Sequence, residues 1–200
     1  MKYSICVSGA ASGKTVESSA ELAEEIGATI AKAGHITTTG ATVGLPYLAA
    51  KSAKEAGGMS IGFSPASSLR EHLYKYRLPI GVFDFVNFTG MHYVGRDIHL
   101  VQSSDAIITV GGRFGSLHEF TTALESRMPC GVLIGSGGTA DVIPILMETL
   151  EPPSKKYVIF DESPKRLVEK IIAMLDEETK DIDLTDKVSN WYLKRNEHKG

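Results

Sequence analysis

Short apolar runs alternate with segments of helical periodicity along nearly the whole of this chain. The run at 105–110 is the clearest buried strand, and the segment at 17–33 repeats Leu22, Ile26 and Ile30 at a four-residue spacing. Strands are predicted at 3–8, 35–39, 59–63, 82–88, 105–110, 131–134 and 157–160. Helices are predicted at 17–33, 43–57, 69–76, 93–104, 115–127, 139–150 and 164–176. This alternation predicts an α/β protein with βαβ units, right-handed crossovers and a mostly parallel sheet.

The length and composition fit one domain of ordinary size. The chain has 200 residues, of which 42% are hydrophobic and 22% are charged, so it can bury a core without a disulfide or a metal. We expect a single domain over 1–177. The remaining residues, 178–200, are expected to form a C-terminal tail or an extra helix.

The charge balance bears on partners and location. Lysine and arginine number 21 against 24 acidic residues, which gives a net charge of −3 and predicts that nucleic acid is not a partner. No window approaches the roughly 18 apolar residues that span a bilayer. The apolar stretch within residues 1–7 is too short for the hydrophobic region and cleavage site of a signal peptide. We therefore expect no membrane association and a cytoplasmic protein.

Neither cysteines nor histidines have the spacing of a metal site. Cys6 and Cys130 lie far apart in apolar runs, which favours buried structural thiols. His92 and His118 flank the candidate site described below, and we interpret them as hydrogen-bonding contacts. We predict that the protein uses no metal and no cofactor.

Four junctions between a predicted strand and the following helix are rich in glycine. Because all such junctions of a parallel sheet emerge at its carboxyl edge, they can build one site there. Glycine lets the backbone approach a ligand closely, and the helix start behind it presents free N–H groups to an anion. The sequence therefore predicts a nucleotide or another phosphorylated small ligand, bound by the junctions at 8–15, 40–44, 111–116 and 135–139.

Two familiar phosphate-binding motifs are absent. The segment Gly9-Ala10-Ala11-Ser12-Gly13-Lys14-Thr15 resembles a P-loop, but three residues separate its glycines where the motif has four. The chain also lacks the G-x-G-x-x-G fingerprint of dinucleotide-binding proteins. ATP hydrolysis of the P-loop type is accordingly disfavoured.

The strongest group of candidate residues runs from Arg96 to Glu119. A helix that begins near Gly115 would let Ser116 and the neighbouring amides hold a phosphate, with Glu119 one turn further along. Arg96 could reach the same cleft from the neighbouring strand end, giving a charge clamp and a polar group beside a developing cation. The alternative is that Glu119 is a solvated helical residue and that Arg96 is its salt-bridge partner or a base on the surface.

These residues resemble the lonely-guy (LOG) family, often labelled lysine decarboxylase-like, over about residues 5–175. The family motif P-G-G-x-G-T-x-x-E falls on 111–119, with its order and length kept. The resemblance extends to Val7-Ser8-Gly9 and to the junction that begins at Thr39-Gly40. It implies a three-layer, doubly wound Rossmann-like fold of about seven strands, in a superfamily that also holds molybdenum-cofactor carriers and DNA-processing protein A.

The resemblance implies a phosphoribohydrolase, which splits a nucleoside 5′-monophosphate into the free base and ribose 5-phosphate. By this similarity, Glu119 would stabilise the oxocarbenium-like sugar or assist the water that attacks it. Arg96 would orient Glu119 and the substrate. The 5′-phosphate would be held by Gly112, Gly115 and Ser116, and the nucleotide cleft would be lined by Ser8, Gly9 and Gly40. Family members are commonly homodimers or larger, so a homo-oligomer is expected.

Three departures from the family motif keep a second function open. Gly111 replaces the proline and Arg113 the second glycine, while Ser116 keeps the hydroxyl of the threonine. Arg113 either adds a cation to the phosphate site or fills the space meant for phosphate. Asp97 after Arg96 is closer to carrier-like members than to cytokinin-activating ones. The alternative function is a non-catalytic carrier or sensor of a phosphorylated ligand, similar to molybdenum-cofactor carriers.

Overall fold

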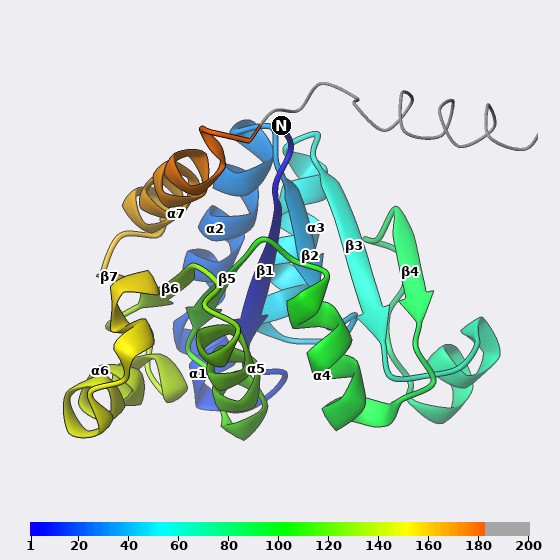
Figure 1. Ribbon diagram of the computed structural model, residues 1–200. Helices are drawn as coiled ribbons and strands as arrows, with labels where there is room; N and C mark the ends of the chain where they lie inside the picture. Colours follow the sequence, from blue (N-terminus) through cyan, green and yellow to red (C-terminus); the bar gives the residue numbers. More distant parts are fainter. Residues whose placement is uncertain (183–200) are drawn as a thin grey trace, which may run out of the picture.

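A seven-stranded sheet, parallel throughout, forms the centre of the computed structural model, which describes residues 1–182 (Figure 1). Its strands are β1 (Ser4–Gly9), β2 (Ile36–Thr39), β3 (Met59–Ser64), β4 (Phe85–Phe88), β5 (Ala106–Val110), β6 (Cys130–Leu133) and β7 (Val158–Asp161). The helices are α1 (Lys14–Ser18), α2 (Ala20–Lys32), α3 (Leu45–Glu55), α4 (His92–Gln102), α5 (Phe114–Glu125), α6 (Thr139–Leu150) and α7 (Pro164–Thr179). The predicted α/β, Rossmann-like fold is confirmed. Residues 183–200 of the predicted tail lie outside the described part.

The strand order creates a point where the direction of winding reverses. The order is β4-β3-β2-β1-β5-β6-β7, so the chain first builds outward from β1 and then returns to β5 on the other side of β1. The register sets Ile5 opposite Ala106 and Gly9 opposite Val110. Open α/β sheets bind ligands at the carboxyl ends of the two strands that flank such a point. The loops after β1 and β5 are therefore expected to lie beside one another.

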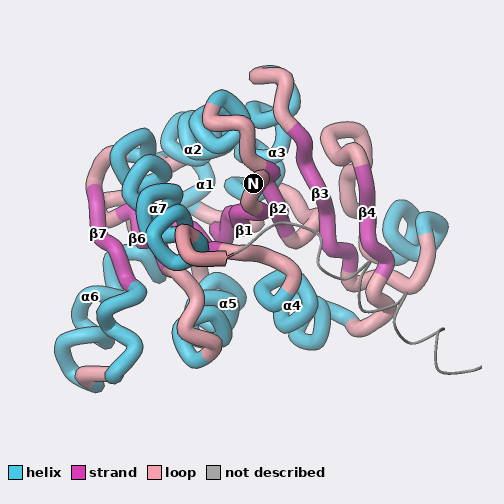
Figure 2. Tube along the Cα trace, turned by 45° about the horizontal axis from the view of Figure 1, so that its top comes forward, coloured by secondary structure: helices cyan, strands magenta, loops and turns pink. Residues whose placement is uncertain are grey.

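Helices cover both faces of the sheet in two layers (Figures 1 and 2). Ile5 and Val7 of β1 face a cluster with α2, α3 and α7, whereas Cys6 faces a cluster with α4, α5 and α6. This alternation follows from the two-residue period of a strand. Cys6 and Cys130 are both free and buried, as predicted. No helix within residues 1–182 combines the length and apolar character needed to cross a membrane.

Two predicted helices differ from the structure. The segment predicted as one helix at 17–33 is divided at Ser19, whose buried side chain donates a hydrogen bond to the carbonyl of Ser136 (2.8 Å). The helix predicted at 69–76 is a five-residue π-helical segment, Glu71–Lys75. Within it, His72 lies between the Ser64 hydroxyl (2.8 Å) and the Pro79 carbonyl (2.9 Å). In both places a buried tertiary hydrogen bond holds the local backbone.

We expect Gly27→Ala to destabilise the protein, although Gly27 lies inside helix α2. A Cβ atom at this position would collide with the backbone carbonyl of Ala49 on α3, so the two helices would have to separate. Such overpacking typically costs about 1–3 kcal/mol, measured here as the free energy of unfolding in urea. Gly81→Ala is the control, because a Cβ on Gly81 would meet no described atom within 4 Å. That control should leave the free energy of unfolding unchanged or raise it by up to about 1 kcal/mol, and equal stability changes in the two variants would contradict the packing argument.

Candidate functional site

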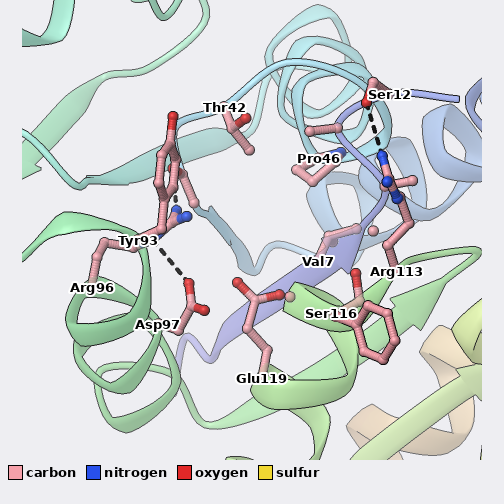
Figure 3. A pocket seen from close by; sticks show the side chains of 16 residues that line it. Val7, Ser12, Thr42, Pro46, Tyr93, Arg96, Asp97, Arg113, Ser116 and Glu119 are labelled. Atoms are coloured by element: carbon pink, nitrogen blue, oxygen red, sulfur yellow. Dashed lines mark hydrogen bonds and ion pairs between the residues drawn. The ribbon is translucent and has the colours of Figure 1, made fainter. Parts of the chain in front are cut away.

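A cavity of about 370 Å³ opens at the carboxyl edge of the sheet, beside the point where the strand order reverses. Segments that are far apart in the sequence meet there (Figure 3). Its lining comes from β1 and the loop after it (Val7 and 9–12), from the chain after β2 (Gly40, Thr42 and Pro46), from α4 (Tyr93, Arg96 and Asp97) and from the start of α5 (113–116 and Glu119). The volume suits a small molecule.

Arg96 is held in the wall of this cavity by the backbone of two neighbouring segments. The residue is only 4% exposed, and its Nη1 donates to the carbonyl oxygens of Gly40 and of Phe63, the latter at 3.1 Å. A Cβ atom on residue 40 would overlap this guanidinium, so only glycine leaves room for it. The position of the cation therefore depends on a missing side chain 56 residues earlier.

The carboxylate partner of Arg96 is the adjacent Asp97. Arg96 Nε lies 3.1 Å from Asp97 Oδ1 as a buried ion pair without hydrogen-bond geometry, and within residues 1–182 this Nε has no hydrogen-bond acceptor. Asp97 Oδ2 lies 3.1 Å from Nδ1 of His118 on α5. Asp97 is 6% exposed. Arg96 therefore pairs with Asp97. The direct ion pair between Arg96 and Glu119 that the sequence suggested is not among the contacts of the described residues.

Glu119 lies on α5, one turn beyond the helix start, and its side chain reaches the cavity. The residue is 8% exposed, and its Oε2 accepts a hydrogen bond from the hydroxyl of Ser8. Burial raises the pKa of Glu119 to about 7. The charge of Arg96 opposes this rise, whereas Asp97 adds to it by charge and by hydrogen bonding. Near neutral pH the group can therefore both donate and accept a proton.

The turn from β5 into α5 forms the opposite wall of the cavity. Gly111 and Gly112 adopt positive φ angles of 57° and 104°, in the left-handed region that favours glycine. The first N–H groups of any α-helix have no acceptor within the helix, and at α5 no side chain of the described residues caps them. A Cβ on Gly115 would meet nothing within 4 Å. An uncapped helix start thus borders open space.

Arg113 stands at the rim and does not fill the cavity. Its side chain is exposed and extends across the opening, where Nη1 lies 3.3 Å from the hydroxyl of Ser12 in the loop after β1 (Figure 3). The open volume remains beside it. Of the two outcomes considered for an arginine at this loop position, the geometry matches an added cation near the start of α5.

Most of the residues singled out from the sequence line this one cavity: Gly9, Gly40, Arg96, Arg113, Gly115, Ser116 and Glu119. Ser8 lies behind it and bonds to Glu119. Gly112 underlies the turn, where a Cβ would press on Ser116. Tyr93 and Asp97 were not among the predicted site residues, and only Asp97 carried a signal, its position next to Arg96. His118, predicted to flank the site as a hydrogen-bonding contact, contacts Asp97. Among residues 1–182, no group of three His, Cys, Asp or Glu side chains is placed to hold a metal ion.

Comparisons with known proteins agree with the fold. An uncharacterised protein of Archaeoglobus fulgidus is 32% identical over 113 residues, which cover 56% of this chain and 69% of that protein. The molybdenum cofactor binding protein of Rippkaea orientalis is 26% identical, with a TM-score of 0.70 over 88% of this chain and 98% of that one. The molybdenum cofactor carrier protein of Chlamydomonas reinhardtii is 25% identical, with a TM-score of 0.69 over 88% and 99%.

The prediction that excluded nucleic acid as a partner is wrong. DNA processing protein A of Helicobacter pylori, whose structure describes single-stranded DNA binding, shares the fold with a TM-score of 0.55. The match covers 86% of this chain and 81% of that one at 17% identity, which shows the fold alone. The net charge of −3 is a property of the whole chain and says little about one surface, so it cannot carry that exclusion.

A family model decides the assignment. The model described as the SLOG cluster4 family matches residues 2–168, which include every strand and every residue of the cavity wall. The resemblance to LOG-type proteins predicted from the motif at 111–119 is thereby confirmed, and this chain belongs to the SLOG cluster4 family.

Proposed function

We propose that this protein binds and holds a small heterocyclic compound that carries a phosphate group. The observation that carries the proposal is the uncapped start of α5, which borders a 370 Å³ cavity with Arg113 at its rim. Free N–H groups, the positive end of the helix dipole and a guanidinium together favour an anion at that place. The phosphate is therefore assigned to 113–116.

The rest of the cavity suits a planar ring. Tyr93 lines the wall formed by α4, and its ring lies 5.9 Å from the guanidinium carbon of Arg96. Aromatic and guanidinium planes are good surfaces for a flat heterocycle. Polar groups that can recognise ring atoms, those of Thr42, Asp97 and Glu119, lie around the same space. The ligand class that fits is a phosphorylated ring compound, either a nucleotide or the molybdenum cofactor.

The comparisons support holding as well as binding. The relatives from Rippkaea orientalis and Chlamydomonas reinhardtii are described as a cofactor binding protein and a cofactor carrier. A carrier must retain its ligand, and native mass spectrometry of protein purified without denaturation tests this. We expect an adduct of constant mass, whose identity distinguishes a nucleotide from the molybdenum cofactor. Absence of any adduct, together with no heat on titration with AMP or GMP, would reject the proposal.

Gly115→Ala should weaken ligand binding without harming the fold. A Cβ at this position meets no protein atom within 4 Å, and alanine is the better helix former, so stability should stay equal or rise. The added methyl group would occupy the space assigned to the phosphate. We expect at least about a tenfold loss of affinity for the nucleotide that binds best, measured by isothermal titration calorimetry.

Gly81→Ala is the matched control for this substitution. Its Cβ also meets nothing within 4 Å, but Gly81 is not among the residues that line the cavity. This variant should bind like the wild type. Unchanged affinity in Gly115→Ala would show that the phosphate lies elsewhere.

A second candidate function is hydrolysis of an N-glycosidic bond, and Glu119 is the observation that favours it. Burial raises the pKa of this cavity carboxyl to about 7, close to the value that general acid–base catalysis needs. Glu119 would donate a proton to the base while the electron pair of the C–N bond leaves with that base. The resulting carboxylate would take a proton from the water that attacks C1′, which restores the acid and releases ribose 5-phosphate.

Glu119→Gln tests hydrolysis separately from binding. If the reaction occurs, this variant should release free adenine from AMP about 10²–10⁴-fold more slowly, because the amide cannot transfer the proton. Chromatography of the products measures the rate, and calorimetry should show that AMP still binds. Glu125→Gln, an exposed carboxylate of the same helix, is the control. A wild-type protein that binds AMP but releases no base would remove the hydrolytic function and leave the binding function standing.

A further inference from the structure

Two buried carboxyl groups from different helices meet in the cavity wall. Asp97 on α4 is 6% exposed and Glu119 on α5 is 8% exposed, and both line the cavity. Figure 3 shows the two carboxyl groups pointing toward one another, below the side chain of Arg96. A carboxylate placed so close to a second carboxyl group, and out of water, disfavours ionisation of that second group and raises its pKa.

The surrounding charges neutralise one carboxylate and not two. Among the described residues that line the cavity, the cations are Arg96 and Arg113, and Arg113 reaches away to Ser12 at the rim. From β1, the nearby Cys6 is neutral, because burial raises the pKa of its thiol well above its usual range. From α5, His118 contacts Asp97. Arg96 therefore balances a single negative charge.

The contacts show which carboxyl group is ionised. Oδ1 of Asp97 lies 3.1 Å from Nε of the cationic Arg96, and Oδ2 lies 3.1 Å from His118 Nδ1, which is a donor in the tautomer that carries its proton there. Glu119 accepts one hydrogen bond, from the Ser8 hydroxyl. Donors stabilise the charged form of the group that they contact. The negative charge therefore belongs on Asp97 and the proton on Glu119.

We infer that the Asp97–Glu119 pair holds one proton up to about neutral pH and that this proton lies on Glu119, with Asp97 as the positioning residue and His118 as its connection to solvent. The side chain of His118 is 38% exposed, so the imidazole reaches water while Nδ1 faces Asp97. The inference concerns the free protein and stands whether or not the proposed function is correct. Where the proposed function holds, Glu119 presents an O–H donor to the ligand, which selects a ring with an acceptor atom.

The pKa of Glu119 in the ligand-free protein tests this directly. Protein labelled with ¹³C at the glutamate side-chain carboxyl carbon is titrated by NMR, and the Glu119 resonance is the one missing from Glu119→Gln. We expect a midpoint near 7 in the wild type. Asp97→Asn removes the neighbouring negative charge and should lower that midpoint by about one pH unit or more. Glu125→Gln removes an exposed charge from the same helix and should leave it in place.

A second measurement covers the case in which Asp97→Asn does not fold. The ordinary pKa of glutamate is 4.5, so folded wild-type protein holds one proton more than unfolded protein between about pH 4.5 and 7. Its unfolding constant should therefore rise about tenfold per pH unit across that window relative to Glu119→Gln, and then level off. A constant ratio, a Glu119 midpoint near 4.5, or a midpoint that Asp97→Asn leaves unchanged would each overturn this placement of the proton.

Discussion

A buried arginine connects the parts of this structure that form the cavity. Arg96 of α4 donates to the carbonyl oxygens of Gly40 after β2 and Phe63 in β3, and it pairs with Asp97. A guanidinium removed from water is tolerated only when its charge and its N–H groups find partners. Two of those partners, Gly40 and Phe63, come from segments other than α4, so the cation keeps α4 against the carboxyl edge of the sheet. The cavity wall depends on this arrangement.

The charges divide the cavity into two chemically different ends. Near α4, the charge of Arg96 is balanced by Asp97, and Glu119 adds a carboxyl group that burial keeps mostly protonated below neutral pH. Near α5, the uncapped helix start and Arg113 have no acidic partner among the described contacts. An anionic group is thus favoured at the second end, and an uncharged polar ring at the first. One molecule with both parts would span the space between them.

The fold followed from the sequence because buried parallel strands leave a plain signal. The apolar run at 105–110 contains β5 (Ala106–Val110), whose residues are all buried. In a parallel sheet, the junctions between strands and the following helices, the glycine-rich ones among them, all lie at the carboxyl edge. Arg96 and Glu119 follow such junctions and therefore line one cavity. Helical periodicity was less informative at 17–33 and 69–76, where buried hydrogen bonds of Ser19 and His72 hold the backbone.

The contacts between residues of the site could not be predicted from the sequence pattern. Asp97 was visible as a difference from cytokinin-activating members of the family, but whether it or Glu119 would pair with Arg96 depends on how α4 and α5 pack. The interaction of Ser8 with Glu119 likewise joins residues 111 positions apart. Spacing places such residues at one edge of a sheet, whereas tertiary packing decides which atoms touch.

The glycine at position 40 has a consequence for how sequences of this family can diverge. The Arg96 guanidinium occupies the space that a side chain at position 40 would need. The carbonyl oxygen of Gly40 also accepts a hydrogen bond from Arg96. Neither residue can be replaced alone without leaving a collision or an unoccupied hollow. Substitutions at the two positions should therefore be inherited together, as a linked pair in the evolutionary record of the fold.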